Sequence, residues 1–149
     1  MSTSLVSELV SDADHVRLSR LVTESALRVD LGQADTLHEL FVEDGELEVD
    51  RIYRGRNEIK GWGEALIAAN LYPGIRHLTS NHRFVTTGPD AEGRDTAAGT
   101  TVLTVFLQDK DGRATTRPFA VGEDHDRFVR TDDGWRFTHR SWQQLFSRN

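Results

Sequence analysis

Asp30 is an acidic residue at a position where an acid is unfavourable. The spacing of apolar residues predicts a helix that stops at Gly32, and a carboxylate in its last turn meets the negative end of the helix dipole. Asp30 also lies four residues after Ala26 and eight after Val22, on the apolar side of that helix. A carboxylate there needs a partner or a chemical role, unless Asp30 is exposed and only forms a turn with Gly32.

His77 is a second residue that could do chemistry. In the strand expected from residue 76, alternation places His77, Thr79 and Asn81 on one face. If Asp30 meets His77, the carboxylate orients one ring nitrogen and leaves the other free to act as a base. The alternative is that His77 is a satisfied or solvent-exposed histidine of the strand.

The turn of the last expected hairpin sets a further group of ionisable residues. The sequence of residues 131–135 suits a three-residue loop in which Gly134 takes the left-handed bulge position. This loop pairs Thr131 with Trp135. A two-residue loop is the alternative, and it shifts the pairing by one residue.

With the three-residue loop, Asp126 lies opposite Arg140 and Asp124 opposite Trp142, all on one face of the sheet. Two acids, an arginine and a tryptophan would then face the same space. With the two-residue loop, His125 would face Arg140 instead. A cross-strand ion pair of structural value alone is also possible.

Other kinds of chemistry find little support in the sequence. No two of the six histidines have a ligand spacing that fits the expected strands, so we expect no metal site. Cysteine is absent, which excludes thiolate catalysis and cysteine metal sites. There is no glycine-rich phosphate loop and no serine in a nucleophile elbow, and we expect no cofactor.

The composition is that of a small acidic domain. A length of 149 residues predicts one domain over residues 1–149, with a core at about 15–145 and a frayed start at 1–12. Its 18 Lys and Arg against 24 Asp and Glu give a net charge of −6, which disfavours nucleic acid as a partner. No apolar run approaches the ~18 residues of a membrane span, and residues 1–14 lack a secretory signal. We therefore expect a cytoplasmic protein with no membrane contact.

Three helices are expected in the first half of the chain. The first runs from about Asp14 to Gly32, and the second covers residues 34–41. Residues 43–45 predict a turn, followed by a strand at 46–50 and a break at 54–57. Asn57 is expected to cap the third helix. That helix runs to about residue 71, with its buried side formed by Ile59, Trp62, Leu66 and Ile67.

Strands dominate the second half of the chain. They are expected at residues 76–87, 96–108, 118–130 and 135–146, with hairpin turns that include residues 109–112. Helices first and an antiparallel meander last predict an α+β domain. In such a domain the helices pack on one face of a curved sheet.

These features together resemble the SnoaL-like branch of the nuclear transport factor 2-like superfamily. The resemblance covers about residues 15–145. It rests on the segments 28–33 (RVDLGQ), 40–45 (LFVEDG), 53–55 (YRG), 76–81 (RHLTSN) and 129–137 (VRTDDGWRF), and on Arg140. It implies a cone-shaped α+β barrel in which three N-terminal helices are wrapped by a curved, mixed or antiparallel sheet.

The resemblance also implies an activity. Asp30 and His77 match the Asp–His pair of hexachlorocyclohexane dehydrochlorinase and, in part, of scytalone dehydratase. This match implies His77 as general base, Asp30 as its orienting partner and Arg140 as a pocket arginine. The reaction would be cofactor-free proton abstraction from a small hydrophobic, ring-containing or polyketide-like substrate, followed by elimination, isomerisation or ring closure. The candidate substrate-binding residues are Tyr53, Trp62, Asn81, Asp124, Asp126 and Trp142.

The chain departs from the pattern of scytalone dehydratase. Val29 precedes Asp30 where that enzyme has a tyrosine, and no histidine occurs in residues 96–108. Asp124 stands where many relatives have an aromatic residue. These departures argue against a scytalone-type substrate.

Two alternatives remain beside the Asp–His reading. Limonene-epoxide hydrolase, of the same superfamily, works with a carboxylate–arginine–carboxylate set, and Asp124, Asp126 and Arg140 could serve in that style. The superfamily also contains ligand-binding modules and assembly subunits that are not catalytic. In all cases the resemblance implies a homodimer, less often a trimer, that buries the outer face of the sheet.

Overall fold

The structure is a computed structural model that describes residues 8–108, 111 and 117–148. The elements, in chain order, are helix α2 (Asp12–Asp30), the 3-10 helix η1 (Ala34–Leu40), strands β1 (Phe41–Glu48) and β2 (Ile52–Arg54), helix α3 (Gly55–Ala69), and strands β3 (Arg76–Pro89), β4 (Asp95–Phe106), β5 (Ala120–Thr131) and β6 (Gly134–Ser147). The predicted α+β class is confirmed. The turn expected at 109–112 falls, apart from Asp111, outside the described residues.

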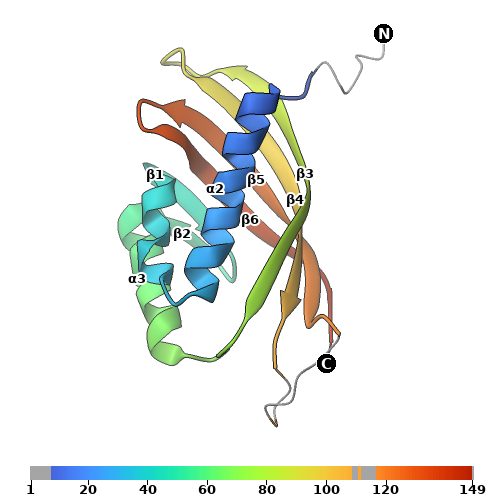
Figure 1. Ribbon diagram of the computed structural model, residues 1–149. Helices are drawn as coiled ribbons and strands as arrows, with labels where there is room; N and C mark the ends of the chain where they lie inside the picture. Colours follow the sequence, from blue (N-terminus) through green and yellow to red (C-terminus); the bar gives the residue numbers. More distant parts are fainter. Residues whose placement is uncertain (1–7, 109–110, 112–116, 149) are drawn as a thin grey trace.

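The strands form one curved, unclosed sheet in the order β2-β1-β6-β5-β4-β3. Strands β3 to β6 are antiparallel neighbours, as the meander predicts, whereas β1 runs parallel to β6. Helix α2 crosses one face of the sheet, here called the inner face, and η1 and α3 cover the end near β1 and β2 (Figure 1). The sheet is therefore mixed, as expected.

Helix α2 follows the apolar spacing that predicted it. Its buried residues are Leu18, Leu21, Val22 and Ser25. Gly32 adopts a left-handed conformation with φ of +72°, and the N–H of Gln33 donates to the carbonyl of Arg28 at 2.7 Å. This arrangement ends the helix at Asp30, because a left-handed residue turns the chain away from the helix axis.

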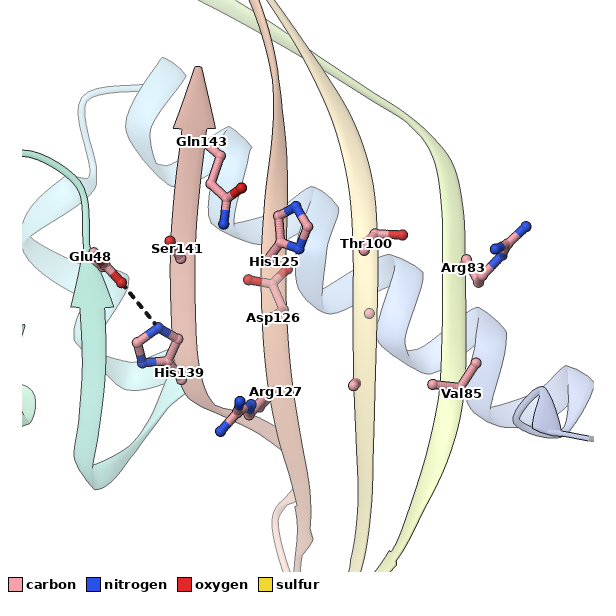
Figure 2. Close-up of a pocket in the computed structure, with 12 residues that line it drawn as sticks. Glu48, Arg83, Val85, Thr100, His125, Asp126, Arg127, His139, Ser141 and Gln143 are labelled. Carbon is pink, nitrogen blue, oxygen red and sulfur yellow. Dashed lines mark ion pairs between the residues drawn. The ribbon is translucent and has the colours of Figure 1, made fainter. Parts of the chain in front are cut away.

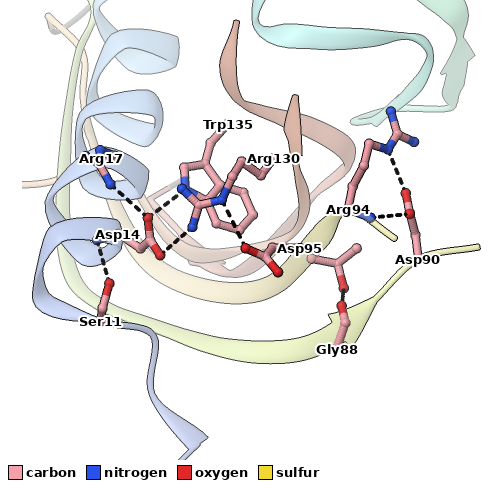
Figure 3. A network of polar contacts seen from close by, with 10 residues as sticks. Ser11, Asp14, Arg17, Gly88, Asp90, Arg94, Asp95, Arg130 and Trp135 are labelled. Carbon is pink, nitrogen blue, oxygen red and sulfur yellow. Dashed lines mark hydrogen bonds and ion pairs between the residues drawn. The ribbon is translucent and has the colours of Figure 1, made fainter. Parts of the chain in front are cut away.

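A polar network anchors the start of α2 to the sheet (Figure 3). The carboxylate of Asp14 accepts hydrogen bonds from Trp135 Nε1 at 3.1 Å and from Arg130 Nη2 at 2.7 Å. Arg130 Nε also donates to Asp95 at 3.2 Å. Burial raises the pKa of Asp14, but the hydrogen bonds from Trp135 and Arg130 outweigh burial and hold this pKa below 3.8. The network fixes where α2 crosses the sheet.

Residues 43–45 do not form the expected turn. They lie within β1, whose pairing with β6 shifts between Phe41 and Glu46. The Gly45 Cα lies close to Phe41, since a Cβ built there would be 3.0 Å from the Phe41 side chain. Long-range pairing with β6 thus absorbs the local turn signal as an irregularity inside a continuous strand.

The third helix begins earlier than expected, and Asn57 does not cap it. Arg54 is at the N-cap position, and its backbone N–H donates to Glu58 Oε2 at 2.7 Å. The preceding short strand β2, which the sequence did not indicate, brings the chain into the helix at that point. Ile59 is fully buried as predicted, whereas Ile67 is exposed.

The hairpin of β5 and β6 combines the two loops considered. Thr131 pairs with Gly134, which makes a two-residue loop, so the expected pairing of Thr131 with Trp135 is wrong. The register then shifts between Arg127 and Phe128, because Thr138 on β6 has no partner. This bulge restores the pairing that the three-residue loop predicted.

As a result Asp126 pairs with Arg140 and Asp124 with Trp142. Both predicted pairs are confirmed, and His125 pairs with Ser141 rather than with Arg140.

The described residues contain no helix with both the length and the apolar character that a bilayer span requires.

Candidate functional site

A largely apolar cavity of about 550 Å³ lies between α2, α3 and the inner face of the sheet. Its apolar wall includes Val29, Leu66, Ile75, Leu103, Phe119 and Trp142. A cavity of this size holds a small organic molecule, and the few polar groups in its wall decide how such a molecule is oriented. Two clusters of paired ionisable side chains are present, and Asp50 and Gln144 are further polar residues of the lining.

Asp30 and His77 form the first polar group. The last residue of α2 meets the start of β3, and His77 Nδ1 lies 2.5 Å from Asp30 Oδ1. The backbone N–H of His77 donates to Asp30 Oδ2 at 2.9 Å. Both oxygens of the carboxylate are therefore engaged by one residue, which fixes the plane of the imidazole ring.

The contact also fixes the tautomer of His77. An ionised carboxylate only accepts hydrogen bonds, so Nδ1 carries the proton and Nε2 holds the lone pair. Within the described part of the chain, Nε2 has no hydrogen-bond partner. His77 lines the cavity, whereas Asp30 lies behind it with its side chain only 3% exposed. This is the arrangement of a base with a buried orienting partner.

Arg140 and two acids form the second polar group. Arg140 on β6 is 7% exposed, and its two Nη atoms donate to Asp124 on β5 and to the hydroxyl of Ser25 on α2. Its Nε lies 3.6 Å from Asp126 Oδ1. Ser25 in turn donates to the carbonyl of Val22 at 2.6 Å. The guanidinium is thus held from three sides.

The two acids beside Arg140 differ in environment. Burial raises the pKa of Asp126 to about 7, an effect that the Arg140 charge opposes and that Asp124 reinforces. Neither carboxyl oxygen of Asp126 has a hydrogen-bond partner in the described residues. Burial lowers the pKa of Arg140, but Asp124 and Asp126 outweigh burial and the pKa is raised. Arg140 therefore stays cationic, and Asp126 is a neutral acid below pH 7.

The strand register separates the two polar groups. His77 pairs with Val105, which pairs with Ala120 on β5, and Asp124 lies four residues further along β5. At roughly 3.3 Å per residue, this offset is about 13 Å along the strands. The wall between the groups is apolar, so a ligand can contact both only if it extends along the cavity.

The structure brings together most of the predicted site residues. Trp62, Trp142, Asp124, Arg140 and His77 all line the cavity. Asp126 does not line it, because its carboxyl group is buried beside Arg140.

Two further predicted substrate-binding residues, beside Asp126, lie outside the cavity. Asn81 is exposed with φ of +53°, where the register of β3 shifts between Ser80 and Arg83. This irregularity interrupts the alternation that placed Asn81 beside His77. Tyr53 lies on β2, where its hydroxyl donates to Asp50 at 3.0 Å and its ring packs against Trp62. Tyr53 supports a wall residue and does not form the wall.

Ser25 is a candidate site residue that the sequence did not single out. The sequence signal that could have identified Ser25 is a polar residue in the buried stripe of α2, where an apolar residue is the norm. The register of Arg140 was needed to see that this hydroxyl accepts from a buried guanidinium.

A second, polar pocket of about 380 Å³ lies on the outer face of the sheet (Figure 2). Its histidines already have acidic partners. His139 Nε2 lies 3.4 Å from Glu48, and His125 Nε2 lies 2.9 Å from Glu123. The side chains of His125 and His139 are 40% and 27% exposed, against 14% for His77, so water competes more for the outer rings. The inner cavity is therefore the better candidate site. The expected dimer through the outer face stays a prediction.

No three His, Asp or Glu side chains among residues 8–108, 111 and 117–148 are grouped to hold a metal ion.

Comparisons with known proteins agree with this architecture. A family model described as a SnoaL-like domain matches residues 12–141. A search of curated proteins found no match.

Several solved structures share the fold. An NTF2-like protein with a cystatin-like fold from Novosphingobium aromaticivorans is 26% identical, with a TM-score of 0.70, over 89% of this chain and 82% of that one. Rv3472 from Mycobacterium tuberculosis, a protein of unknown function, is 24% identical, with a TM-score of 0.72, over 90% of this chain and 77% of that one. A candidate scytalone dehydratase from N. aromaticivorans is 20% identical, with a TM-score of 0.68, over 91% and 87%.

Proposed function

The chain belongs to the SnoaL-like domain family, and from this premise we propose that it is a cofactor-independent lyase, isomerase or cyclase. Its substrate is a small hydrophobic molecule, ring-containing or polyketide-like, that carries an acidic C–H bond. The observation that carries this proposal is the His77–Asp30 pair, whose histidine lines an apolar cavity and whose aspartate is buried behind it. The likeness in fold to a candidate scytalone dehydratase is consistent with it.

His77 is the base in this proposal. Nε2 takes the proton from carbon, and the negative charge of Asp30 stabilises the imidazolium that forms. The electron pair left on carbon then expels a leaving group, is reprotonated at another position, or attacks an electrophilic carbon of the same molecule. These three outcomes are elimination, isomerisation and ring closure. A base of this kind contributes about 10²–10⁴-fold to the rate.

The apolar wall contributes to the reaction as well. Side chains such as Leu103, Phe119 and Trp142 hold a ring system and keep water away from it. With less water present, the Asp30 charge acts more strongly on the imidazolium, because the local dielectric is lower. The wall also holds the C–H bond within reach of His77.

A second candidate is hydrolysis or cyclisation of an epoxide at the Arg140 cluster. The geometry favours it, since Asp124 and Arg140 both line the cavity and Arg140 lies between Asp124 and Asp126 in a carboxylate–arginine–carboxylate set. In this alternative Asp124 is the group that reaches the ligand, because Asp126 does not line the cavity.

Deuterium exchange tests the first proposal without knowledge of the natural substrate. The probe is 2-tetralone, a bicyclic ketone whose C–H bonds next to the carbonyl are weakly acidic. In deuterium oxide the protein should accelerate the loss of these proton signals from the NMR spectrum. His77→Ala should abolish the acceleration, whereas His125→Ala, a matched change on the outer face, should retain it. Equal exchange by both variants would reject His77 as the base and leave the Arg140 cluster or a binding role.

A further inference from the structure

Arg140 is the only lysine or arginine among the described residues that line the cavity. A buried arginine in an apolar site ordinarily attracts carboxylate ligands, because its planar guanidinium donates two parallel hydrogen bonds to them. The position of Arg140 alone would therefore predict an acidic substrate.

The partners of Arg140 change that expectation. One Nη donates to Asp124 and the other to Ser25, and Nε faces Asp126 at 3.6 Å. The positive charge is balanced by Asp124 before any ligand enters. A ligand carboxylate would have to displace Asp124 or be buried beside it, and burial of an unpaired charge is costly.

The remaining charges of the cavity act in the same direction. Asp30 is a buried carboxylate behind His77, and Asp50 contributes a further acid to the lining. With Arg140 balanced by Asp124, the wall as a whole has no positive charge left for an anion. It repels anions and accepts neutral molecules.

Asp124 itself is suited to bind a hydroxyl group. An ionised carboxylate accepts about four hydrogen bonds and donates none, and the Arg140 contact uses one position on Oδ2. Asp124 lines the cavity at the end away from His77. A ring hydroxyl placed there would donate to Asp124 while the rest of the molecule extends along the apolar wall toward the base.

We propose that Asp124 is the specificity-determining residue of this cavity, which takes neutral hydroxylated ring compounds and rejects the corresponding carboxylates. The inference rests on the proposed function only in taking this cavity as the substrate site, and it holds whether or not His77 is a base.

Isothermal titration calorimetry with 2-naphthol and 2-naphthoate, near neutral pH, tests the proposal. The two probes share one ring system, but 2-naphthol has a neutral hydroxyl group where 2-naphthoate has a charged carboxylate. The protein should bind 2-naphthol at least about tenfold more tightly than 2-naphthoate. This is the difference in affinity expected when one hydrogen bond is lost or one charge is repelled. Equal affinities, tighter binding of 2-naphthoate, or binding of neither probe would overturn the proposal.

Asp124→Asn assigns the preference to a residue. It removes the charge that balances Arg140, so 2-naphthoate should gain affinity, 2-naphthol should lose it, and the ratio should fall by about tenfold or more. Glu123→Gln is the matched control. Glu123 is the neighbour of Asp124 on β5, and it pairs with His125 outside the cavity. Its loss of one negative charge should leave the affinity ratio unchanged. An unchanged ratio in Asp124→Asn would overturn the role of Asp124.

Two further measurements keep the outcomes separate. If circular dichroism shows that Asp124→Asn does not fold, Asp124→Glu replaces it. Glutamate retains the charge in a longer side chain, so 2-naphthoate must still be rejected, and a gain in its affinity overturns the proposal. His77→Ala should keep the preference for 2-naphthol, so a failure of the exchange experiment and a failure of this inference are distinguishable.

Discussion

His77 meets the carboxylate of Asp30 twice, once through the ring nitrogen Nδ1 at 2.5 Å and once through its backbone N–H at 2.9 Å. The two contacts come from the end of α2 and the start of β3, which are 47 residues apart in the sequence. Because one contact is made by the backbone, the carboxylate keeps its place even when the ring moves. The base and its partner are therefore built into the joint between helix and sheet.

Asp30→Asn should lower the deuterium exchange rate of 2-tetralone by about 10²–10⁴-fold. Asparagine keeps the size of the side chain and an oxygen for the backbone N–H of His77, but it removes the charge that stabilises the imidazolium. The rate is followed by NMR, with Asp132→Asn in the exposed β5–β6 turn as the matched control. A fully folded Asp30→Asn protein with an unchanged rate would contradict the role given to Asp30.

Asp126 should make the protein less stable as the pH rises from 4 to 8. Burial raises its pKa in the folded protein from 3.8 to about 7, so the folded state holds a proton that the unfolded chain has lost. Its contribution is complete below pH 3.8 and is lost as the pH rises through 7. Over this range it amounts to about 4 kcal/mol, at roughly 1.4 kcal/mol per pKa unit.

Asp126→Asn checks this dependence. Asparagine is neutral at every pH and similar in size, so the variant should gain free energy of unfolding relative to the unsubstituted protein as the pH rises. Urea unfolding at several pH values between 4 and 8 measures the difference. Two curves that remain parallel over this range would show that Asp126 does not titrate there.

Asp14→Asn should destabilise the protein at neutral pH by about 1.5–3 kcal/mol, the value of a hydrogen bond to a charged group. The folded pKa of Asp14 is below 3.8, so its contribution is present above pH 3.8 and is lost as the pH falls through the folded pKa. The difference in free energy of unfolding between the unsubstituted protein and Asp14→Asn should therefore narrow below pH 4. This is opposite to Asp126, whose contribution is lost as the pH rises. Asp12→Asn in the same helical turn is the control. If urea unfolding shows no effect of Asp14→Asn, the claim that Asp14 anchors α2 to the sheet is wrong.

Local signals in the sequence were sufficient for part of this site. The apolar period of residues 18–29 and Gly32 placed Asp30 at a helix end, and strand alternation placed His77 on one face with Thr79 and Asn81. Both deductions depend only on neighbours within a few residues. The residues alone left the contact between Asp30 and His77 open, and only the family resemblance implied it. The structure shows that contact.

Irregular pairing decided what the sequence could not. The bulge at Thr138 restored the pairing of Asp126 with Arg140 after a shorter loop than expected, whereas the shift near Asn81 turned that residue out of the cavity. A bulge adds one unpaired residue to one strand. Its position depends on the pairing with the partner strand, and the sequence of one strand alone does not reveal that pairing. Ser25 was missed for a related reason, because its role requires Arg140 from another element.

Chemical rescue of His77→Ala is the most direct test of the central claim, that the imidazole of His77 removes a proton from a ligand in the cavity. The variant lacks the ring but keeps Asp30, so added imidazole can occupy the vacated space and accept a proton. We predict that His77→Ala loses the exchange of 2-tetralone and that imidazole restores part of it, in proportion to its concentration, well beyond its effect on a solution without protein. Exchange by His77→Ala at the rate of the unsubstituted protein, before any imidazole is added, would contradict the account.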